Sequence, residues 1–132
     1  MPPDLAEMTS HPGALFLLLG AISAALGVAL GAFGAHGLEG AVTPERLATF
    51  ETGARYQLYH ALALLAVGLA IGQGIGGLQG AGWLFVAGTV FFSGSLYALV
   101  LLDKPILGAV TPIGGVCFIV GWALFALAAW RS

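Results

Sequence analysis

Charged side chains are scarce in this sequence, where Asp, Glu, Lys and Arg together make up 8% of the 132 residues. Soluble globular domains carry about 25% charged residues, so a soluble fold of this size could not cover its surface. A bilayer removes that requirement. Of the residues, 59% are hydrophobic, and the mean hydropathy is +0.99. The composition therefore predicts an integral membrane protein.

Basic residues and cysteine are also in short supply. Four Lys and Arg residues against six Asp and Glu residues leave a net charge of −2, without the basic patch that nucleic-acid binding requires. Cys117 is the single cysteine and lies in an apolar run, so the chain can form neither an internal disulfide nor a redox thiol pair. We expect no nucleic-acid partner and a chemically inert thiol.

Positive charge is missing before the first apolar run as well. Residues 1–12 hold no Lys or Arg, whereas a secretory signal normally begins with a positive segment. The apolar run that follows, of about 22 residues, is longer than the hydrophobic part of a typical signal. We therefore expect a retained membrane span.

Four apolar segments are present, at about residues 13–34, 56–72, 82–102 and 113–130. Each is close to the roughly 20 residues that a helix needs to cross a 30 Å hydrocarbon core. The connections are short, so consecutive helices run antiparallel. The sequence predicts an all-α membrane fold, an antiparallel bundle of four transmembrane helices that forms one integral membrane domain over residues 1–132.

The second span looks short, but a helix start precedes it. Thr43 can cap the helix with its hydroxyl, and Pro44 is favoured at the first helical position. A helix over residues 44–72 would be about 43 Å long, more than a bilayer requires. Its first turns therefore lie in the interface, tilt, or break near Gly53. We expect an interfacial amphipathic segment, because apolar residues recur there at helical spacing: Leu47, Phe50, Ala54 and Leu58.

Small residues indicate where helices pack closely. In the first span they step by three or four residues along one face, and the third span holds a similar group. Such seams let backbones approach where lipid provides no hydrophobic drive, and they also permit self-association or packing against a larger protein. The predicted packing positions are Gly20, Gly27, Gly31, Gly34, Gly88, Ser93, Gly94 and Ser95.

A short motif occurs twice, 68 residues apart. Gly40-Ala41-Val42-Thr43-Pro44 recurs as Gly108-Ala109-Val110-Thr111-Pro112, and each copy begins an even-numbered helix. A duplicated two-helix hairpin would produce this echo. Independent convergence of two helix starts on Thr-Pro capping would produce it too, and we favour that interpretation.

Seven ionisable side chains are concentrated between His36 and His60. Five residues of this stretch are candidates for a functional role: His36, Glu51, Arg55, Tyr59 and His60. We interpret them as a polar cluster near the membrane interface, in which Glu51 pairs with Arg55 and the cluster holds the second helix against the first. No catalytic residue is assigned.

This cluster has two other interpretations. His36 and His60 could hold a metal or haem, since imidazole is a common ligand, but the further ligands of a zinc site are missing. A proton or ion path is the second alternative, because intramembrane ionisable groups are functional by default. Spans three and four carry no ionisable residue, so side chains alone could not relay across the bilayer. The mid-span hydroxyls of Ser93, Ser95 and Tyr97 more often bond neighbouring helices.

Several motifs together resemble a known family. They are GAFGAHGL (31–38), TGARYQLYHALAL (52–64), FSGSLY (92–97), TPIGG (111–115) and Gly121-Trp122. The chain resembles domain of unknown function family 423, whose animal members are called transmembrane protein 256, over about residues 13–130. The resemblance implies a small four-span protein of bacterial inner or mitochondrial-type membranes, with no established activity. Arg55 departs from it, standing at a variable position.

The function we expect is non-enzymatic, since no nucleophile–base pair or paired carboxylates occur at useful spacing. We expect a structural or accessory component of a larger membrane assembly, without a cofactor or metal, in contact with lipids and with larger membrane proteins. A small transporter or channel is the alternative. The positive-inside rule sets Arg46, Arg55 and Lys104 against Arg131 and predicts both termini outside.

Overall fold

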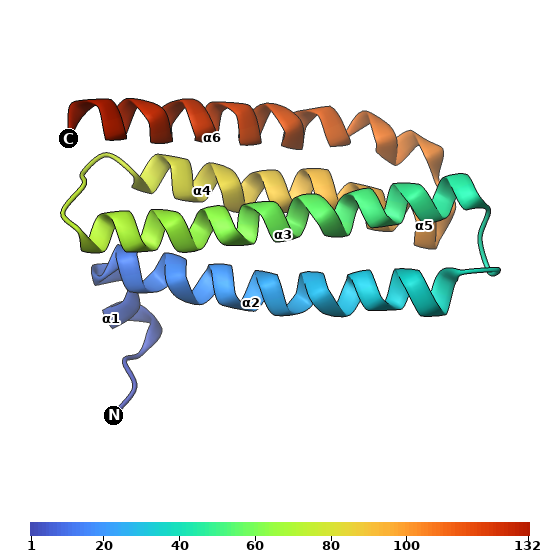
Figure 1. Cartoon of the computed structure of the whole chain (residues 1–132), viewed down its shortest axis with the longest axis horizontal. Coiled ribbons are helices and arrows are strands. Elements are labelled where there is room, and N and C mark those ends of the chain that lie inside the picture. Colours follow the sequence, from blue (N-terminus) through green and yellow to red (C-terminus); the bar gives the residue numbers. More distant parts are fainter.

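The computed structural model describes residues 1–132 and shows an antiparallel bundle of four membrane-length helical passes (Figure 1). The passes are Pro12–Leu38, Pro44–Gly72, Gln79–Leu102 and Pro105–Arg131, each long and apolar enough to cross a membrane. They contain the four predicted spans and extend beyond them. The predicted all-α membrane fold is therefore confirmed, and both termini lie at the same end of the bundle.

Three of the passes are built from more than one element. The short helix α1 (Leu5–Ser10) precedes α2 (Pro12–Phe33), which continues as a π-helical turn, Gly34–Leu38. Helices α4 (Gln79–Gly88) and α5 (Gly94–Leu102) are joined by a second π-helical turn, Thr89–Ser93. A 3₁₀ turn, Pro105–Ala109, leads into α6 (Thr111–Arg131). The two π-helical turns are wider than α-helical ones and change the direction of the side chains that follow them, whereas the 3₁₀ turn is tighter.

Helix α3 (Pro44–Gly72) is a single uninterrupted helix. It begins as predicted, because the Thr43 hydroxyl accepts a hydrogen bond from the backbone N–H of Arg46 at 3.2 Å. Its first turns belong to the bundle, since Phe50 is fully buried between Leu38 and Val100. The amphipathic segment is thus the packed beginning of α3, and no break occurs at Gly53.

The two copies of the repeated motif differ in structure. Thr43 caps α3, whereas Thr111 does not cap α6 and its hydroxyl lies 2.6 Å from the Ser95 hydroxyl. Gly40 adopts a positive φ of 79°, whereas Gly108 lies in the 3₁₀ turn. Convergence on Thr-Pro capping therefore does not account for the second copy.

The small residues of α2 face α3. A Cβ atom on Gly20 would lie 2.9 Å from the Ala61 carbonyl oxygen, and one on Gly27 would lie 3.0 Å from the Leu58 side chain. Gly34 meets Phe50 in the same way, and Gly31 fits more loosely. The predicted seam is packed against α3 within the same chain, so it is not free for self-association.

The predicted packing residues of the third pass divide into two groups. Gly88 lies directly against the ring of Phe118, and Ser93 and Ser95 are buried. Gly94 has open space where its Cβ would be, so its assignment as a packing residue was wrong. The π-helical turn rotates the helix at this point, and Ser93 faces α3 in place of Gly94.

The apolar core consists of two clusters at different levels of the bundle. The larger includes Phe16, Leu64 and Phe85, and the smaller consists of Leu38, Phe50 and Val100. Between Phe50 and Leu64, α3 places its buried polar side chains. The core therefore has a polar layer between two apolar ones.

Candidate functional site

The buried polar side chains form a layer near the middle of the bundle, which we call the central polar layer. It consists of five residues: Gln57, His60, Ser93, Ser95 and Tyr97. Gln57 and His60 are only 5% and 4% exposed, and both come from the buried face of α3. His60 lies about 24 Å along a helix about 43 Å long, so its side chain is far from either end of α3.

His60 is hydrogen-bonded at both ring nitrogens. Its Nδ1 lies 2.8 Å from the backbone carbonyl oxygen of Tyr56, and its Nε2 lies 3.1 Å from the indole Nε1 of Trp122. An indole N–H can only donate, so Nε2 is the acceptor and carries no proton. The proton of the neutral ring is then on Nδ1, which donates to the carbonyl. This arrangement fits the neutral imidazole.

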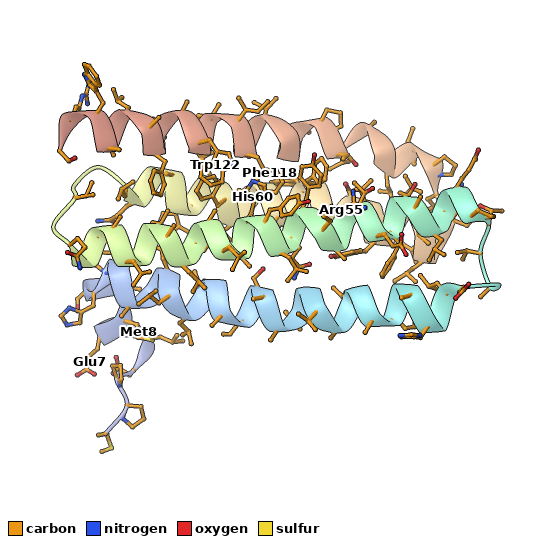
Figure 2. The ribbon with its side chains drawn as sticks, viewed as in Figure 1. Glu7, Met8, Arg55, His60, Phe118 and Trp122 are labelled. Carbon is orange, nitrogen blue, oxygen red and sulfur yellow. The ribbon has the colours of Figure 1, made fainter.

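Aromatic rings surround this imidazole. Phe118 of α6 stacks on it with a centroid separation of 3.5 Å and an interplanar angle of 8°, and Phe85 of α4 lies 5.5 Å away. Figure 2 shows His60, Phe118 and Trp122 together between α3 and α6. These rings exclude water, so the two hydrogen bonds are the ring's only polar partners.

Gln57 joins three helices through its side-chain amide. Its Nε2 donates to the Ser23 carbonyl oxygen of α2 at 2.9 Å, and its Oε1 accepts from the Tyr97 hydroxyl of α5 at 2.7 Å. Both ends of the amide are thus occupied by groups from neighbouring helices. The Tyr97 hydroxyl bonds a neighbouring helix, as the sequence predicts.

The two serines of the layer also bond between elements. The Ser93 hydroxyl donates to the Gly53 carbonyl oxygen of α3 at 2.7 Å, where glycine lets the two backbones approach. The Ser95 hydroxyl lies 2.6 Å from the Thr111 hydroxyl of α6 and donates to the Phe92 carbonyl oxygen at 2.9 Å. No buried side-chain nitrogen or oxygen in the chain lacks a hydrogen-bond partner.

The structure separates the five residues of the predicted polar cluster. His36 is exposed in the π-helical turn that ends α2, and Arg55 and Tyr59 are exposed on α3, with Glu51 partly exposed. His60 alone is buried, and it contacts α4 and α6 rather than α2. The prediction that His60 lies near the interface and holds α3 against α2 was therefore wrong.

The predicted ion pair between Glu51 and Arg55 is absent. The one ion pair of the chain joins Arg46 to Asp103 at 3.3 Å, and the same guanidinium donates to the Leu99 carbonyl oxygen. This contact ties the first turn of α3 to the end of α5. Arg46 and Asp103 are 57 residues apart in the chain, so no local sequence pattern predicts this ion pair.

Metal ligation by His60 would require a rearrangement. Its only unprotonated nitrogen already accepts from Trp122, so a metal could bind only after the indole moved away. His36 belongs to a different surface, and no group of three His, Cys, Asp or Glu side chains comes together. The pair proposed from the sequence is thus not assembled as a site.

Gln57, Phe118 and Trp122 are the important residues that sequence reasoning missed. A signal was available for Gln57, because Gly53, Gln57, His60 and Leu64 follow one another at helical spacing on a single face. An amide and an imidazole on the same face as glycine and leucine indicate buried polar groups. No comparable signal identified the aromatic partners on α6.

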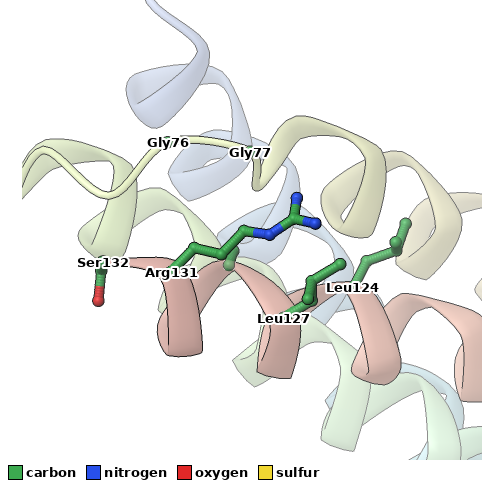
Figure 3. A pocket seen from close by; sticks show the side chains of 7 residues that line it. Gly76, Gly77, Leu124, Leu127, Arg131 and Ser132 are labelled. Atoms are coloured by element: carbon green, nitrogen blue, oxygen red, sulfur yellow. The ribbon is translucent and has the colours of Figure 1, made fainter.

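The surface has three hollows. One of about 240 Å³ lies between α2 and α4 and is lined by apolar side chains together with Ser23, Gln57 and Thr89. One of about 410 Å³ lies at the end of the bundle that carries the termini, where Arg131 extends beside Gly77 (Figure 3). The third, of about 650 Å³, lies at the opposite end, near Arg46 and Asp103. None of them contains His60.

Comparison with known proteins identifies relatives that match most of the chain. Residues 30–115 match the family model described as "Protein of unknown function (DUF423)". The chain is 51% identical over 117 residues to the UPF0382 membrane protein YwdK of Bacillus subtilis (strain 168), covering 87% of this chain and 95% of that protein. It is 49% identical over 117 residues to the UPF0382 membrane protein SAB0533 of Staphylococcus aureus (strain bovine RF122 / ET3-1), covering 89% and 96%. No solved structure matches the chain. With a family model matching more than half of its length, this integral membrane protein belongs to the DUF423 family.

Proposed function

We propose that this protein is a non-catalytic, accessory component of a larger membrane assembly. The observation that carries the proposal is the use of the central polar layer. Its hydrogen bonds join α3 to α2, α5 and α6, and every buried polar side-chain atom is satisfied within the chain. Groups used in this way hold a bundle together and leave none directed at a substrate.

The outer surface supports the same proposal. Large apolar side chains are exposed along the two outer helices, including Leu26 and Val28 on α2 and Ile119 on α6. In a membrane such faces contact lipid tails or the apolar helices of another protein. A compact bundle with satisfied buried polar groups and apolar faces is suited to packing beside a larger partner.

The experiment is purification under conditions that preserve membrane assemblies. The full chain, tagged at its C-terminus, would be extracted with a mild detergent or a lipid-preserving polymer from its native membrane and analysed by native mass spectrometry. We expect a larger membrane protein in fixed stoichiometry. A Trp122→Ala variant, expected to loosen the bundle, provides a matched control that should lose the partner. Recovery of the chain alone, or only with copies of itself, would reject the accessory role.

One observation favours a second function, a small proton-coupled transporter. His60 is an ionisable group at mid-bundle, where such groups are usually functional. Transport would require its ring to release Trp122 and accept a proton at Nε2. Proteoliposomes with an imposed pH gradient provide the test, since transport predicts a proton flux that His60→Gln abolishes.

We further propose a bacterial inner-membrane location with both termini outside. The ends of the bundle differ in positive charge, with Arg46, Arg55 and Lys104 toward one end and Arg131 at the end of the termini. Positive residues favour the cytoplasmic side. Labelling of cysteines placed next to Met1 and at Ser132, in a Cys117→Ala background, tests this with an impermeant reagent on intact cells. If both cysteines are labelled only after lysis, the termini lie on the cytoplasmic side and the proposed orientation is wrong.

A further inference from the structure

The outward side of α3 carries polar groups that the rest of the chain leaves without partners. Glu51, Arg55, Tyr59 and Leu62 follow one another at spacings of four, four and three residues, so they form one stripe, which we call the α3 outer face. Tyr59 is 53% exposed and Leu62 is 61% exposed. The stripe therefore looks away from the bundle.

None of the three polar side chains on this face is paired within the chain. The single ion pair of the protein is formed elsewhere, between Arg46 and Asp103. No side-chain hydrogen bond involves Glu51, Arg55 or Tyr59, whereas the polar side chains of the interior are all satisfied. The α3 outer face therefore carries an unpaired acid and an unpaired base on neighbouring turns of one helix.

The α3 outer face extends from the end of the bundle well toward its middle. Arg55 lies about 16 Å along α3 from its first residue. The neighbouring Gly53 is hydrogen-bonded to Ser93, which precedes Asp103 by about 15 Å along its own pass. At this depth a guanidinium facing lipid is costly, and its side chain can reach the headgroups only by snorkelling. A protein partner that supplies a carboxylate would remove the cost.

We infer that the α3 outer face binds a second copy of this chain in a parallel two-fold dimer. In such a dimer each residue of one copy meets its counterpart or a residue one turn away on the partner. Glu51 then pairs with the partner's Arg55, and Arg55 pairs with the partner's Glu51. Tyr59 and Leu62 pack against their counterparts below the charges. The glycine seam of α2 takes no part, because it is buried against α3.

The charge pattern of the α3 outer face favours a second copy of the chain as its partner. An acid and a base one turn apart on the same stripe are self-complementary about a two-fold axis. An anionic lipid headgroup would be attracted by Arg55 but repelled by Glu51, one turn closer to the membrane surface. This inference does not depend on the accessory role, because a dimer can form with or without a larger partner.

Reversing the charge of Glu51 in one chain and of Arg55 in another tests the dimer. It also distinguishes an ion pair between two chains from an ion pair within one chain. The full chain would be labelled with donor or acceptor dye and reconstituted in vesicles of phosphatidylcholine, with energy transfer measured across a range of protein-to-lipid ratios. We expect Glu51→Lys alone and Arg55→Glu alone each to weaken dimerisation by at least about tenfold, because each homodimer then holds two like-charge contacts. The two variants mixed should recover energy transfer close to that of the wild type.

The mixture is the decisive sample. A Glu51→Lys chain beside an Arg55→Glu chain has opposite charges at both contacts, whereas a pair within one chain would remain broken in both. Glu45→Lys is the matched control, since Glu45 is exposed in the first turn of α3 and outside the stripe, and it should leave dimerisation unchanged. Circular dichroism would verify that each variant remains folded.

Three results would overturn the inference. Wild-type chains that remain monomeric at every protein-to-lipid ratio would do so, as would a mixture that fails to recover energy transfer. The third is preferential association with anionic phosphatidylglycerol over phosphatidylcholine in mixed-lipid vesicles that is lost in Arg55→Glu, with no wild-type dimer at any lipid composition. That result would assign the face to lipid headgroups.

Discussion

The indole N–H of Trp122 in α6 donates to Nε2 of His60 in α3, 62 residues earlier in the chain, at 3.1 Å. The ring of Phe118, one turn before Trp122, stacks on the same imidazole at 3.5 Å. These contacts connect two helices whose backbones share few close approaches, so side chains carry much of their association. His60 is therefore a structural connector in this fold, with its polar capacity fully used.

We expect Trp122→Phe to destabilise the bundle by about 1–3 kcal/mol, because it removes the only donor to His60 Nε2 and leaves a buried acceptor unsatisfied. Hydrogen bonds between membrane helices average about 0.6 kcal/mol, and the buried acceptor left without a partner accounts for the larger loss expected here. Reversible unfolding in mixed micelles would measure the change. Trp130→Phe is the control, since Trp130 is 86% exposed and should tolerate the change. Equal losses in both variants would contradict the structural role of the indole.

Substitution of the two histidines of the predicted polar cluster should have different effects on stability. His60→Ala removes both hydrogen bonds and the stacking partner of Phe118, so we expect a loss of about 2–4 kcal/mol or failure to assemble. His36→Ala changes an exposed residue and should cost within about 0.5 kcal/mol. Both wild type and variants should purify without stoichiometric metal. Near one equivalent of metal in the wild type, lost in His60→Ala, would contradict this assignment.

Much of this fold follows from the sequence, but the placement of His60 does not. The four passes, the Thr43 cap and the α2 seam can be predicted from apolar length, from the Thr43-Pro44 helix start and from small-residue spacing, which are local properties. The depth of His60 depends instead on where α3 enters the bundle. Because Glu51 and Arg55 are charged, the apolar part of α3 is predicted to begin only at about residue 56. His60 is then predicted to lie near the end of the membrane span. The packed helix begins at Pro44, which puts His60 in the middle.

The partners of the polar side chains were equally out of reach of sequence reasoning. Which residue of α6 meets His60 depends on the rotation and height of two helices that are not neighbours in sequence. Thr111 shows the same limit, because its Thr-Pro context predicts a cap and its position beside α5 gives it Ser95 as a partner. Local patterns therefore predict helix boundaries well. They do not predict pairings across the bundle.

The seam between α2 and α3 should be intolerant of a side chain at Gly20. At Gly20 a Cβ atom would lie 2.9 Å from both the Ala61 carbonyl oxygen and the Leu65 side chain, so the two helices must separate. We expect Gly20→Val to destabilise by about 1–3 kcal/mol or more, as overpacking does. The matched control is Gly94→Val, where open space surrounds the new side chain. Comparable stability of the two variants, measured by thermal unfolding in the same detergent, would show that the seam is not closely packed.

The amide of Gln57 couples α2 to α5, and a double-mutant cycle can isolate that coupling. Gln57→Leu and Tyr97→Phe each break the 2.7 Å bond between Oε1 and the phenolic hydroxyl, but Gln57→Leu also releases the Ser23 carbonyl. We therefore expect Gln57→Leu to cost more than Tyr97→Phe, and the double variant to cost less than their sum by about 0.5–1.5 kcal/mol. The free energy of unfolding of the four proteins, measured in one detergent, provides the cycle. Strict additivity would mean that the bond contributes nothing to stability, and the central polar layer would then be a set of independent contacts rather than a connected network.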